Sequence, residues 1–559
     1  MSCNLQSSSE RRFIRFYINI FFCRIRYTLY ILAHRDPNKS WLQTSPIFPG
    51  RMDIKIPFLA FFFLVLLHKL IRSYIAPPSR STKPPALRLP PGPWQLPLIG
   101  SLHHLLLSRF RDLPHRALLE MSGTFGPLML LRFGAVPTLV VSSAEAAREV
   151  MKTHDLAFCS RHLSATIGII SCGGKDIIFS NYNERWRELR KLCMLELFSQ
   201  RRVLSFRPVR EEEVANLLRS VSGECGGGPV NLREGICHAI NDIAVRTAIG
   251  NRCKYQDEYL HELDEAVRLT GGFNLADLYP SSRLVRRLSA AARDMERCQK
   301  NMYRIIECII QERKGSPTPE REDDLLGVLL RLQREGGLQF DLTNEIVSTV
   351  IFDIFSAGSE TSSTVLVWAM AELVKNPRVM HKAQAELRET FKGQDKLTEG
   401  DMVKLRYLHL VIKETLRLHA PVPLLLPREC RQTCQVMGYD IPKGTKVFVN
   451  VWAIARDSKL WQDGDEFRPE RFDGSSIDFK GTHFEYTPFG AGRRICPGIT
   501  LGLANTELLL ASLLYHFDWE LPDGVKMEEL DMAEAFGITL RKKSRLWLKA
   551  KPHINVISN

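Results

Sequence analysis

The sequence predicts a mainly α-helical fold with small β-sheets. Apolar residues recur at helical spacing over Leu342–Asn376, the longest such stretch, and over most of Arg210–Arg313. A third helical pattern follows Pro497, and proline suits the first turn of a helix. Strand signals are fewer and shorter, at Leu128–Phe133 and Thr138–Val141. Helices are therefore expected to form the body of the protein.

The composition is that of an ordinary globular protein. Of the 559 residues, 45% are hydrophobic and 25% are charged, which are normal shares. The net charge of +14 invites a nucleic-acid interpretation, but no nucleic-acid module or aromatic-interleaved basic patch is present. An acidic protein or an anionic lipid surface is the expected partner of a basic face. The 13 cysteines are scattered without recurring Cys-x-x-Cys pairs, which argues against a zinc site or a disulfide framework.

The N-terminal region predicts a membrane anchor followed by a linker. Phe13–Leu32 is apolar but contains three arginines, which makes it a poor membrane span. Residues 52–75 hold the uninterrupted apolar run Ile56–Leu67 and are predicted to form the anchor helix. Residues 76–95 form a basic, proline-rich linker and hinge. No small-residue cleavage site follows the apolar run, so a retained anchor is favoured over a signal peptide.

The stretch Pro488–Gly498 places Cys496 between a glycine-rich loop and the last helical pattern. There the cysteine would face the positive end of a helix dipole, which favours thiolate over thiol. Gly490 can turn sharply and bring backbone N–H groups toward the sulfur. A thiolate is one of the few axial ligands of haem iron, whereas a lone cysteine is more often simply buried. The full pattern Phe-x-x-Gly-x-Arg-x-Cys-x-Gly is met at Phe489, Gly492, Arg494, Cys496 and Gly498.

This stretch resembles the haem-binding loop of the cytochrome P-450 superfamily. The resemblance implies that Cys496 is the axial ligand of haem b, a thiolate-ligated iron protoporphyrin IX. It assigns Phe489, Gly490, Arg494 and Gly498 to the surroundings of the haem. The implied fold holds haem between the long central helix and the cysteine-loop helix, in a catalytic domain over residues 96–552, with 553–559 as a tail.

Members of the microsomal type begin at a position equivalent to Met52. Residues 1–51 are therefore interpreted as an N-terminal extension produced by an upstream start site. The same resemblance implies a single-pass protein of the endoplasmic reticulum membrane, in contact with membrane lipid. Its catalytic domain would face the cytosol.

Trp186 and Arg190 are four residues apart and share one helix face. Without other information a solvated basic helix would be the preferred interpretation. The resemblance assigns both residues to a haem propionate and adds Arg428 as a further haem contact. The preceding Ser180–Asn183 departs from the Ala-Pro-Tyr-Gly usual in plant members, so the loop over the substrate is expected to have a different shape.

The central helix contains small polar residues over Ala357–Ser362, which weaken it locally. One explanation is tight helix packing, with the Thr361 hydroxyl bonded to a carbonyl one turn back. The other is that Gly358 lets a ligand approach while Thr361 and Glu360 supply protons. The stretch resembles the oxygen-activating motif of the superfamily, which favours the second explanation and makes Thr361 and Glu360 the predicted catalytic residues.

Glu414 and Arg417 are three residues apart on a predicted helix and can pair. The resemblance adds Arg471, from Pro469–Phe472, as the third member of a buried structural cluster. It also predicts a substrate pocket lined by Ala357, Val422, Leu425, Phe536 and Ile538.

The implied activity is that of a monooxygenase, which inserts one atom of O₂ into a small hydrophobic molecule. The resemblance also implies that electrons come from NADPH through a partner flavoprotein reductase, and the lack of a dinucleotide fingerprint or flavin module in the sequence is consistent with this. Overall likeness points to a plant terpenoid substrate, a sesquiterpene or diterpene. The alternatives are a phenylpropanoid, flavonoid or other phenolic hydroxylase, and more distantly a haem-thiolate isomerase or dehydratase, which Thr361 disfavours. A non-enzymatic haem sensor would need neither Thr361, Glu360 nor a reductase, and a membrane scaffold would carry no haem.

Overall fold

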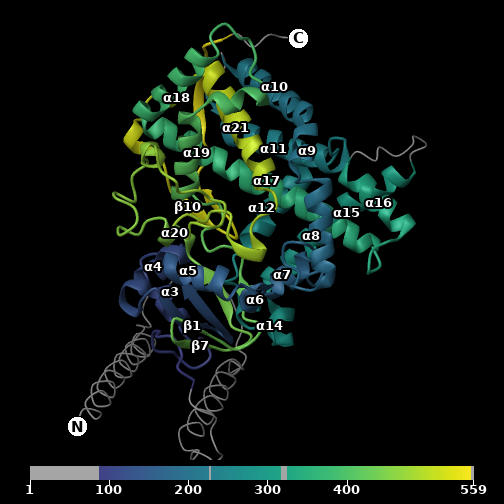
Figure 1. The fold of residues 1–559 in the computed structure, drawn as a ribbon, viewed down its shortest axis with the longest axis vertical. Coiled ribbons are helices and arrows are strands. Elements are labelled where there is room, and N and C mark those ends of the chain that lie inside the picture. Colours follow the sequence, from purple (N-terminus) through teal and green to yellow (C-terminus); the bar gives the residue numbers. More distant parts are fainter. Residues whose placement is uncertain (1–86, 226–227, 316–323, 555–559) are drawn as a thin grey trace, which may run out of the picture. The chain divides into compact units, whose positions relative to one another are not determined.

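The computed structural model describes residues 87–225, 228–315 and 324–554 (Figure 1). The chain divides into two units, Met1–Pro85 and Ala86–Asn559, and the second is the subject here. The predictions for residues 1–51, for the anchor at 52–75, for the linker up to residue 86 and for most of the tail lie outside the described residues. Within the described ranges, no helix is both long and apolar enough to cross a membrane.

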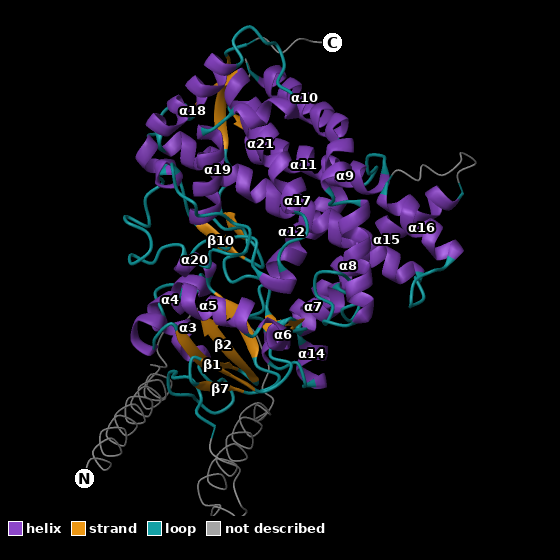
Figure 2. Cartoon of the chain, in the orientation of Figure 1, coloured by secondary structure: helices purple, strands orange, loops and turns teal. Residues whose placement is uncertain are grey.

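Helices dominate the described part of the chain, as the hydrophobic periodicity of the sequence predicts (Figure 2). Those before the central helix are α3 (Leu102–Leu107), α4 (Pro114–Phe125), α5 (Ala144–Arg148), α6 (Asp155–Phe158), α7 (Ala165–Ile170), α8 (Glu184–Glu196), α9 (Gln200–Ser205), α10 (Arg207–Glu224), α11 (Leu232–Ile249), α12 (Gln256–Leu269), α13 (Leu275–Leu278), α14 (Arg283–Leu288), α15 (Ala290–Lys314) and α16 (Leu325–Glu335). The central helix and its successors are α17 (Asn344–Lys375), α18 (Pro377–Thr390), α19 (Tyr407–Leu418), α20 (Val451–Ile454) and α21 (Ile499–His516).

The strands of the described residues form four small sheets. The largest has the order β1-β2-β8-β5-β3 and lies at one end of the unit beside α3, α4 and α5 (Figure 1). Its strands are β1 (Leu128–Phe133), β2 (Val136–Val141), β3 (Ser160–Arg161), β5 (Arg428–Glu429) and β8 (Lys446–Val449). The others are β4-β12-β9, β6-β7 and β10-β11, with β4 (Val230–Asn231), β6 (Cys434–Val436), β7 (Tyr439–Ile441), β9 (Phe517–Glu520), β10 (Glu534–Phe536), β11 (Leu540–Lys542) and β12 (Trp547–Pro552).

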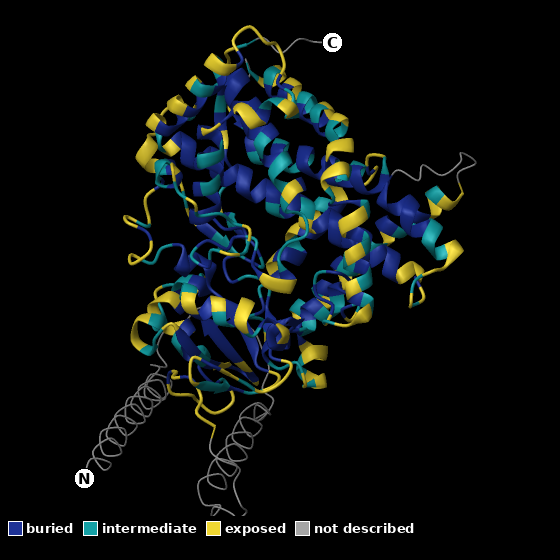
Figure 3. Cartoon of the chain, in the orientation of Figure 1, coloured by how far each residue is buried: buried dark blue, intermediate teal, exposed yellow. Residues whose placement is uncertain are grey.

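The central helix α17 is buried almost all round, which explains why its sequence is apolar on every face (Figure 3). It begins after Thr343, whose side chain accepts a hydrogen bond from the N–H of Ile346. It packs against α11 and α21. Ala357 is exposed, and Gly358 and Thr361 are half-buried, so one turn of this buried helix has an open side. The fold places Ala357 and Thr361 of the predicted oxygen-activating motif on that open side.

The cysteine loop differs from expectation at the start of its helix. Pro497 does not occupy the first helical position, because α21 begins at Ile499 with Gly498 at the N-cap. Gly490 and Gly492 both have φ of +70°. A Cβ on Gly492 would lie 2.2 Å from the carbonyl O of Met151. The loop therefore requires glycine there for backbone conformation and for close packing.

Candidate active site

Cys496 lies in the loop that precedes α21 and is half-buried. Its backbone N–H donates to the carbonyl O of Phe489 at 3.0 Å, which closes the loop. Burial raises the pKa of the Cys496 thiol above its ordinary value, and this outweighs the lowering by the Gly498 N–H and the Arg190 charge. Burial therefore opposes the thiolate that the helix dipole is expected to favour. A bound metal ion deprotonates a coordinating thiol outright.

Four arginines converge near this loop, and the sequence predicted only three of them. The predicted three are Arg190, Arg428 and Arg494, and the fourth is Arg161 of β3. Burial and the charges of the other three arginines lower the pKa of Arg161. Burial lowers the pKa of Arg494 to about 9. Arg428 reaches Asp155 at 3.3 Å, but positive charges outnumber the acids around them. Nothing in the sequence next to Arg161 marks it, because only folding brings it to the other three.

Arg494 has a buried nitrogen without a partner. Its Nε donates to the carbonyl O of Cys159 at 2.6 Å and its Nη2 donates to Ser180, but Nη1 has no acceptor among the described residues. A buried, unsatisfied donor on a charged group is costly. The cluster is therefore suited to an anionic group with several acceptor oxygens, such as a pair of carboxylates.

Trp186 is close to this cluster, but its indole N–H is already used. It donates to the carbonyl O of Ile177 at 2.9 Å, and the Arg494 guanidinium lies 3.9 Å from the centre of its ring. Arg190 donates to the carbonyl O of Ile495. The unusual Asn183 caps α8, because its side chain accepts from the N–H of Trp186 at 2.8 Å. Trp186 therefore contacts the Arg494 guanidinium with the face of its ring, while its indole N–H is used elsewhere.

The motif on α17 divides between two faces. The Thr361 hydroxyl donates to the carbonyl O of Ala357 at 2.8 Å, which is the bond one turn back that a packing explanation predicts. A Cβ on Gly358 would lie 3.3 Å from Cβ of Ala244, so this glycine permits close packing of α17 on α11. Thr361 nevertheless lies on the same side of the helix as the exposed Ala357, where a ligand can approach.

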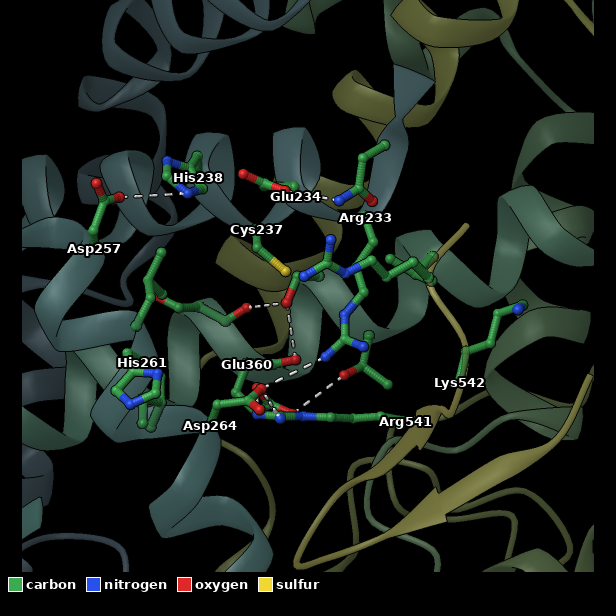
Figure 4. A pocket seen from close by; sticks show the side chains of 18 residues that line it. Arg233, Glu234, Cys237, His238, Asp257, His261, Asp264, Glu360, Arg541 and Lys542 are labelled. Carbon is green, nitrogen blue, oxygen red and sulfur yellow. Dashed lines mark hydrogen bonds and ion pairs between the residues drawn. The ribbon is translucent and has the colours of Figure 1, made fainter. Parts of the chain in front are cut away.

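The Glu360 side chain binds the segment that begins β11. Its carboxylate accepts from the Arg541 guanidinium (Figure 4). It also accepts from the Thr539 hydroxyl at 2.6 Å. It lines a polar pocket of about 480 Å³ between α11, α12, α17 and β11. The structure therefore separates Glu360 from Thr361, although the sequence-based prediction gave them a shared role.

The predicted substrate-pocket residues other than Ala357 are half-buried apolar side chains, namely Val422, Leu425, Phe536 and Ile538. Leu425 lies beside the cysteine loop, because a Cβ on Gly490 would lie 3.8 Å from its Cδ1. The N–H of Leu540 donates to the carbonyl O of Pro421 at 2.8 Å. This bond ties the segment that carries Val422 and Leu425 to the hairpin that carries Phe536 and Ile538.

The structure brings Glu414, Arg417 and Arg471 together. Glu414 accepts from Arg417 Nε at 2.7 Å and from Arg471 Nε at 2.9 Å. Arg417 also donates to the carbonyl oxygens of Ala455 and Gly464. The carboxylate is fully buried, so the cluster ties α19 to the segment that leads into the cysteine loop.

Replacing Glu414 by alanine is expected to destabilise the protein by roughly 3–5 kcal/mol, because two buried guanidinium groups lose their carboxylate. Chemical unfolding of the variant and its haem content would measure this loss. Arg468→Gln is the matched control, since this nearby arginine is partly exposed and lies 3.5 Å from Asp463. A Glu414→Ala variant as stable as the control would contradict the role of the cluster.

The family follows from a comparison over nearly the full described length. The model of the family Cytochrome P450 matches residues 90–548. The chain belongs to the cytochrome P450 family. It is thus an oxidoreductase that acts on paired donors and incorporates oxygen from O₂.

Curated relatives and solved structures agree with this P450 assignment. Dolabradiene monooxygenase of Zea mays is 54% identical over 83% of this chain and 92% of its own length. Ent-isokaurene C2/C3-hydroxylase of Oryza sativa subsp. japonica is 50% identical over 89% of this chain and 97% of its own length. A zebra fish cytochrome P450 solved with abiraterone is similar at a TM-score of 0.68 and 28% identity, over 79% of this chain and 100% of that chain.

The residues of this P450 fit its family's haem. Cys496 would hold the iron, and Arg161, Arg190, Arg428 and Arg494 would hold the two propionates, which supply the acceptor that Arg494 Nη1 lacks. Haem with a thiolate ligand activates O₂. The protein's own part is to present Thr361 on the open side of α17 and to keep the cysteine loop closed.

Proposed function

We propose that this P450 monooxygenase hydroxylates a terpenoid of sesquiterpene or diterpene size. The observation that carries the proposal is the likeness, at about half of all positions, to dolabradiene monooxygenase and ent-isokaurene C2/C3-hydroxylase. The name of each relative includes the name of an unsaturated hydrocarbon, dolabradiene in one and ent-isokaurene in the other. The half-buried Val422, Leu425, Phe536 and Ile538 offer apolar surface to such a molecule.

We further propose that electrons arrive from NADPH through a membrane-bound flavoprotein reductase. The net charge of +14 suits an acidic partner. Arg493 lies in the cysteine loop, Pro488–Gly498, and about half of its side chain is exposed, at 47%. Docking there would bring the reductase to the thiolate side of the haem. The endoplasmic reticulum membrane, reached through residues 52–75, is the proposed location.

The test is turnover by the full chain co-expressed with a plant reductase. A panel of terpene hydrocarbons and phenolic compounds is supplied with NADPH in an atmosphere of labelled O₂. Oxygenated terpenoid products that carry one labelled oxygen are expected. Turnover confined to the phenolic compounds would overturn the terpenoid proposal, and rearranged products without O₂ uptake would indicate an isomerase.

A further inference from the structure

The Glu360 carboxylate is held mainly by Arg541 of β11 and by Thr539 just before this strand. A carboxylate offers about four lone-pair positions for hydrogen bonds. Oε1 accepts from Arg541 Nε, from the Thr539 hydroxyl at 2.6 Å and from the Thr364 hydroxyl at 3.4 Å, whereas Oε2 accepts from Arg541 Nη2. Glu360 and Arg541 meet in the polar pocket, which Thr364 also lines (Figure 4). Three of these four hydrogen bonds come from Thr539 and Arg541, so Glu360 chiefly binds the hairpin β10–β11.

Arg541 connects this carboxylate to a second element. Its Nη1 donates to the carboxylate of Asp264 on α12. Arg233 of α11 also lies near this group, 3.6 Å from the Asp264 carboxylate. The contact with Glu360 is a bidentate ion pair, which is stronger and more directional than a single hydrogen bond. Burial alone would lower the pKa of Arg541, but the Glu360 and Asp264 carboxylates raise it above its ordinary value. Arg541 thus remains charged and bridges α12, α17 and β11.

The bridge holds a turn that carries two predicted substrate contacts. β10 and β11 are antiparallel, with Phe536 opposite Leu540. At the turn between them, the N–H of Ile538 donates to the carbonyl O of Val267 at 3.1 Å, and a Cβ on Gly537 would lie only 2.7 Å from that oxygen. The turn therefore lies directly on α12.

The start of β11 is bound to α17 in two ways. Trp368 donates its indole N–H to the carbonyl O of Leu540 at 3.0 Å. The Arg541 and Thr539 side chains bind Glu360. Among the charged residues of α17, all of which the structure describes, Glu360 is the one that forms an ion pair with β11.

We propose that Glu360 and Arg541 are positioning residues that lock the β10–β11 turn against the central helix and so set where Phe536 and Ile538 meet the substrate. Glu360 then determines substrate fit, and Thr361 stands alone in the chemistry on the open side of the helix. The inference rests on the proposed substrate pocket for its kinetic readout, whereas its structural readout is independent of any substrate.

The structural readout is amide hydrogen exchange in the haem-loaded full chain. Arg541→Gln should release the turn, because it leaves the Glu360 carboxylate without its cation. We expect exchange at the amides of Ile538 and Leu540 to accelerate by about tenfold or more. Arg545→Gln is the matched control, since Arg545 is exposed, lines the same pocket and forms no ion pair with the described residues. Equal exchange in the variant, the control and the wild type would overturn the inference.

The kinetic readout separates positioning from proton supply. Glu360→Gln and Arg541→Gln should raise KM, by about fivefold or more, and change the ratio of oxidised positions in the product. The peroxide released per NADPH should stay at the wild-type level. If Glu360→Gln instead releases peroxide at unchanged KM, Glu360 is a proton donor and the inference is wrong.

Two further variants keep the test decisive if Arg541→Gln does not fold. Arg541→Lys retains the charge but loses the bidentate contact, and an intermediate rise in exchange at Ile538 is expected. The double variant Glu360→Gln/Arg541→Gln removes both charges and should be more stable than Arg541→Gln. Wild-type exchange in Arg541→Lys and in the double variant would contradict the lock. If the wild type oxidises no terpenoid, the proposed substrate fails while the exchange result still decides the lock.

Discussion

Replacing Cys496 by serine is expected to abolish the thiolate-type carbonyl spectrum of the reduced protein and, with it, all monooxygenase turnover. A serine hydroxyl has nearly the same size as the thiol but does not provide a thiolate ligand to iron. The loop itself should persist, because its closing bond runs from the backbone N–H of residue 496 to the carbonyl O of Phe489. The measurement is the difference spectrum of the reduced protein with and without carbon monoxide.

The matched control is Cys225→Ser. This half-buried cysteine lies at the end of α10, and its Sγ contacts the carbonyl O of Val221 at 3.2 Å, a contact that serine can also make. The control should keep both the spectrum and the turnover. A thiolate-type spectrum that survives in Cys496→Ser would mean that another cysteine binds the iron.

The helices of the body could be predicted closely because hydrophobic periodicity is a local signal. The pattern over Leu342–Asn376 corresponds to α17 at Asn344–Lys375. The cysteine loop was equally visible, since five of its positions are fixed within one short stretch. Its helix start was misjudged by two residues, because Gly498 rather than Pro497 borders the helix.

Long-range convergence could not be predicted from these patterns. Arg161 stands 265 residues from Leu426, to whose carbonyl it donates, and no local spacing announces its place in the arginine cluster. Arg541 lies 181 residues from Glu360. The resemblance placed Glu360 beside Thr361 in function, whereas only the fold shows that its carboxylate is bound by a distant strand. Helix geometry already points adjacent residues in different directions, but only the fold shows which groups each side chain meets.

Replacing Thr361 by alanine is expected to uncouple the reaction. The Thr361 hydroxyl is the polar group that α17 presents beside the exposed Ala357, so it is placed to hold a proton donor where O₂ is reduced. Positioned proton transfer typically contributes ~10²–10⁴-fold in rate. NADPH and O₂ should still be consumed, while product falls and hydrogen peroxide rises. The substrate-induced change in the haem absorption spectrum should persist, because the side chain is small and its hydroxyl bonds only its own helix.

The same measurement on two other variants decides between chemistry and packing. Ser363→Ala removes a similar bond one turn back, from Ser363 Oγ to the carbonyl O of Ser359 at 2.7 Å, but in a buried position. It should leave the yield of product per NADPH unchanged. Thr361→Ser keeps the hydroxyl and should restore most of that yield. Full product yield in Thr361→Ala would show that Thr361 only packs, because the bond to Ala357 would then be its sole contribution.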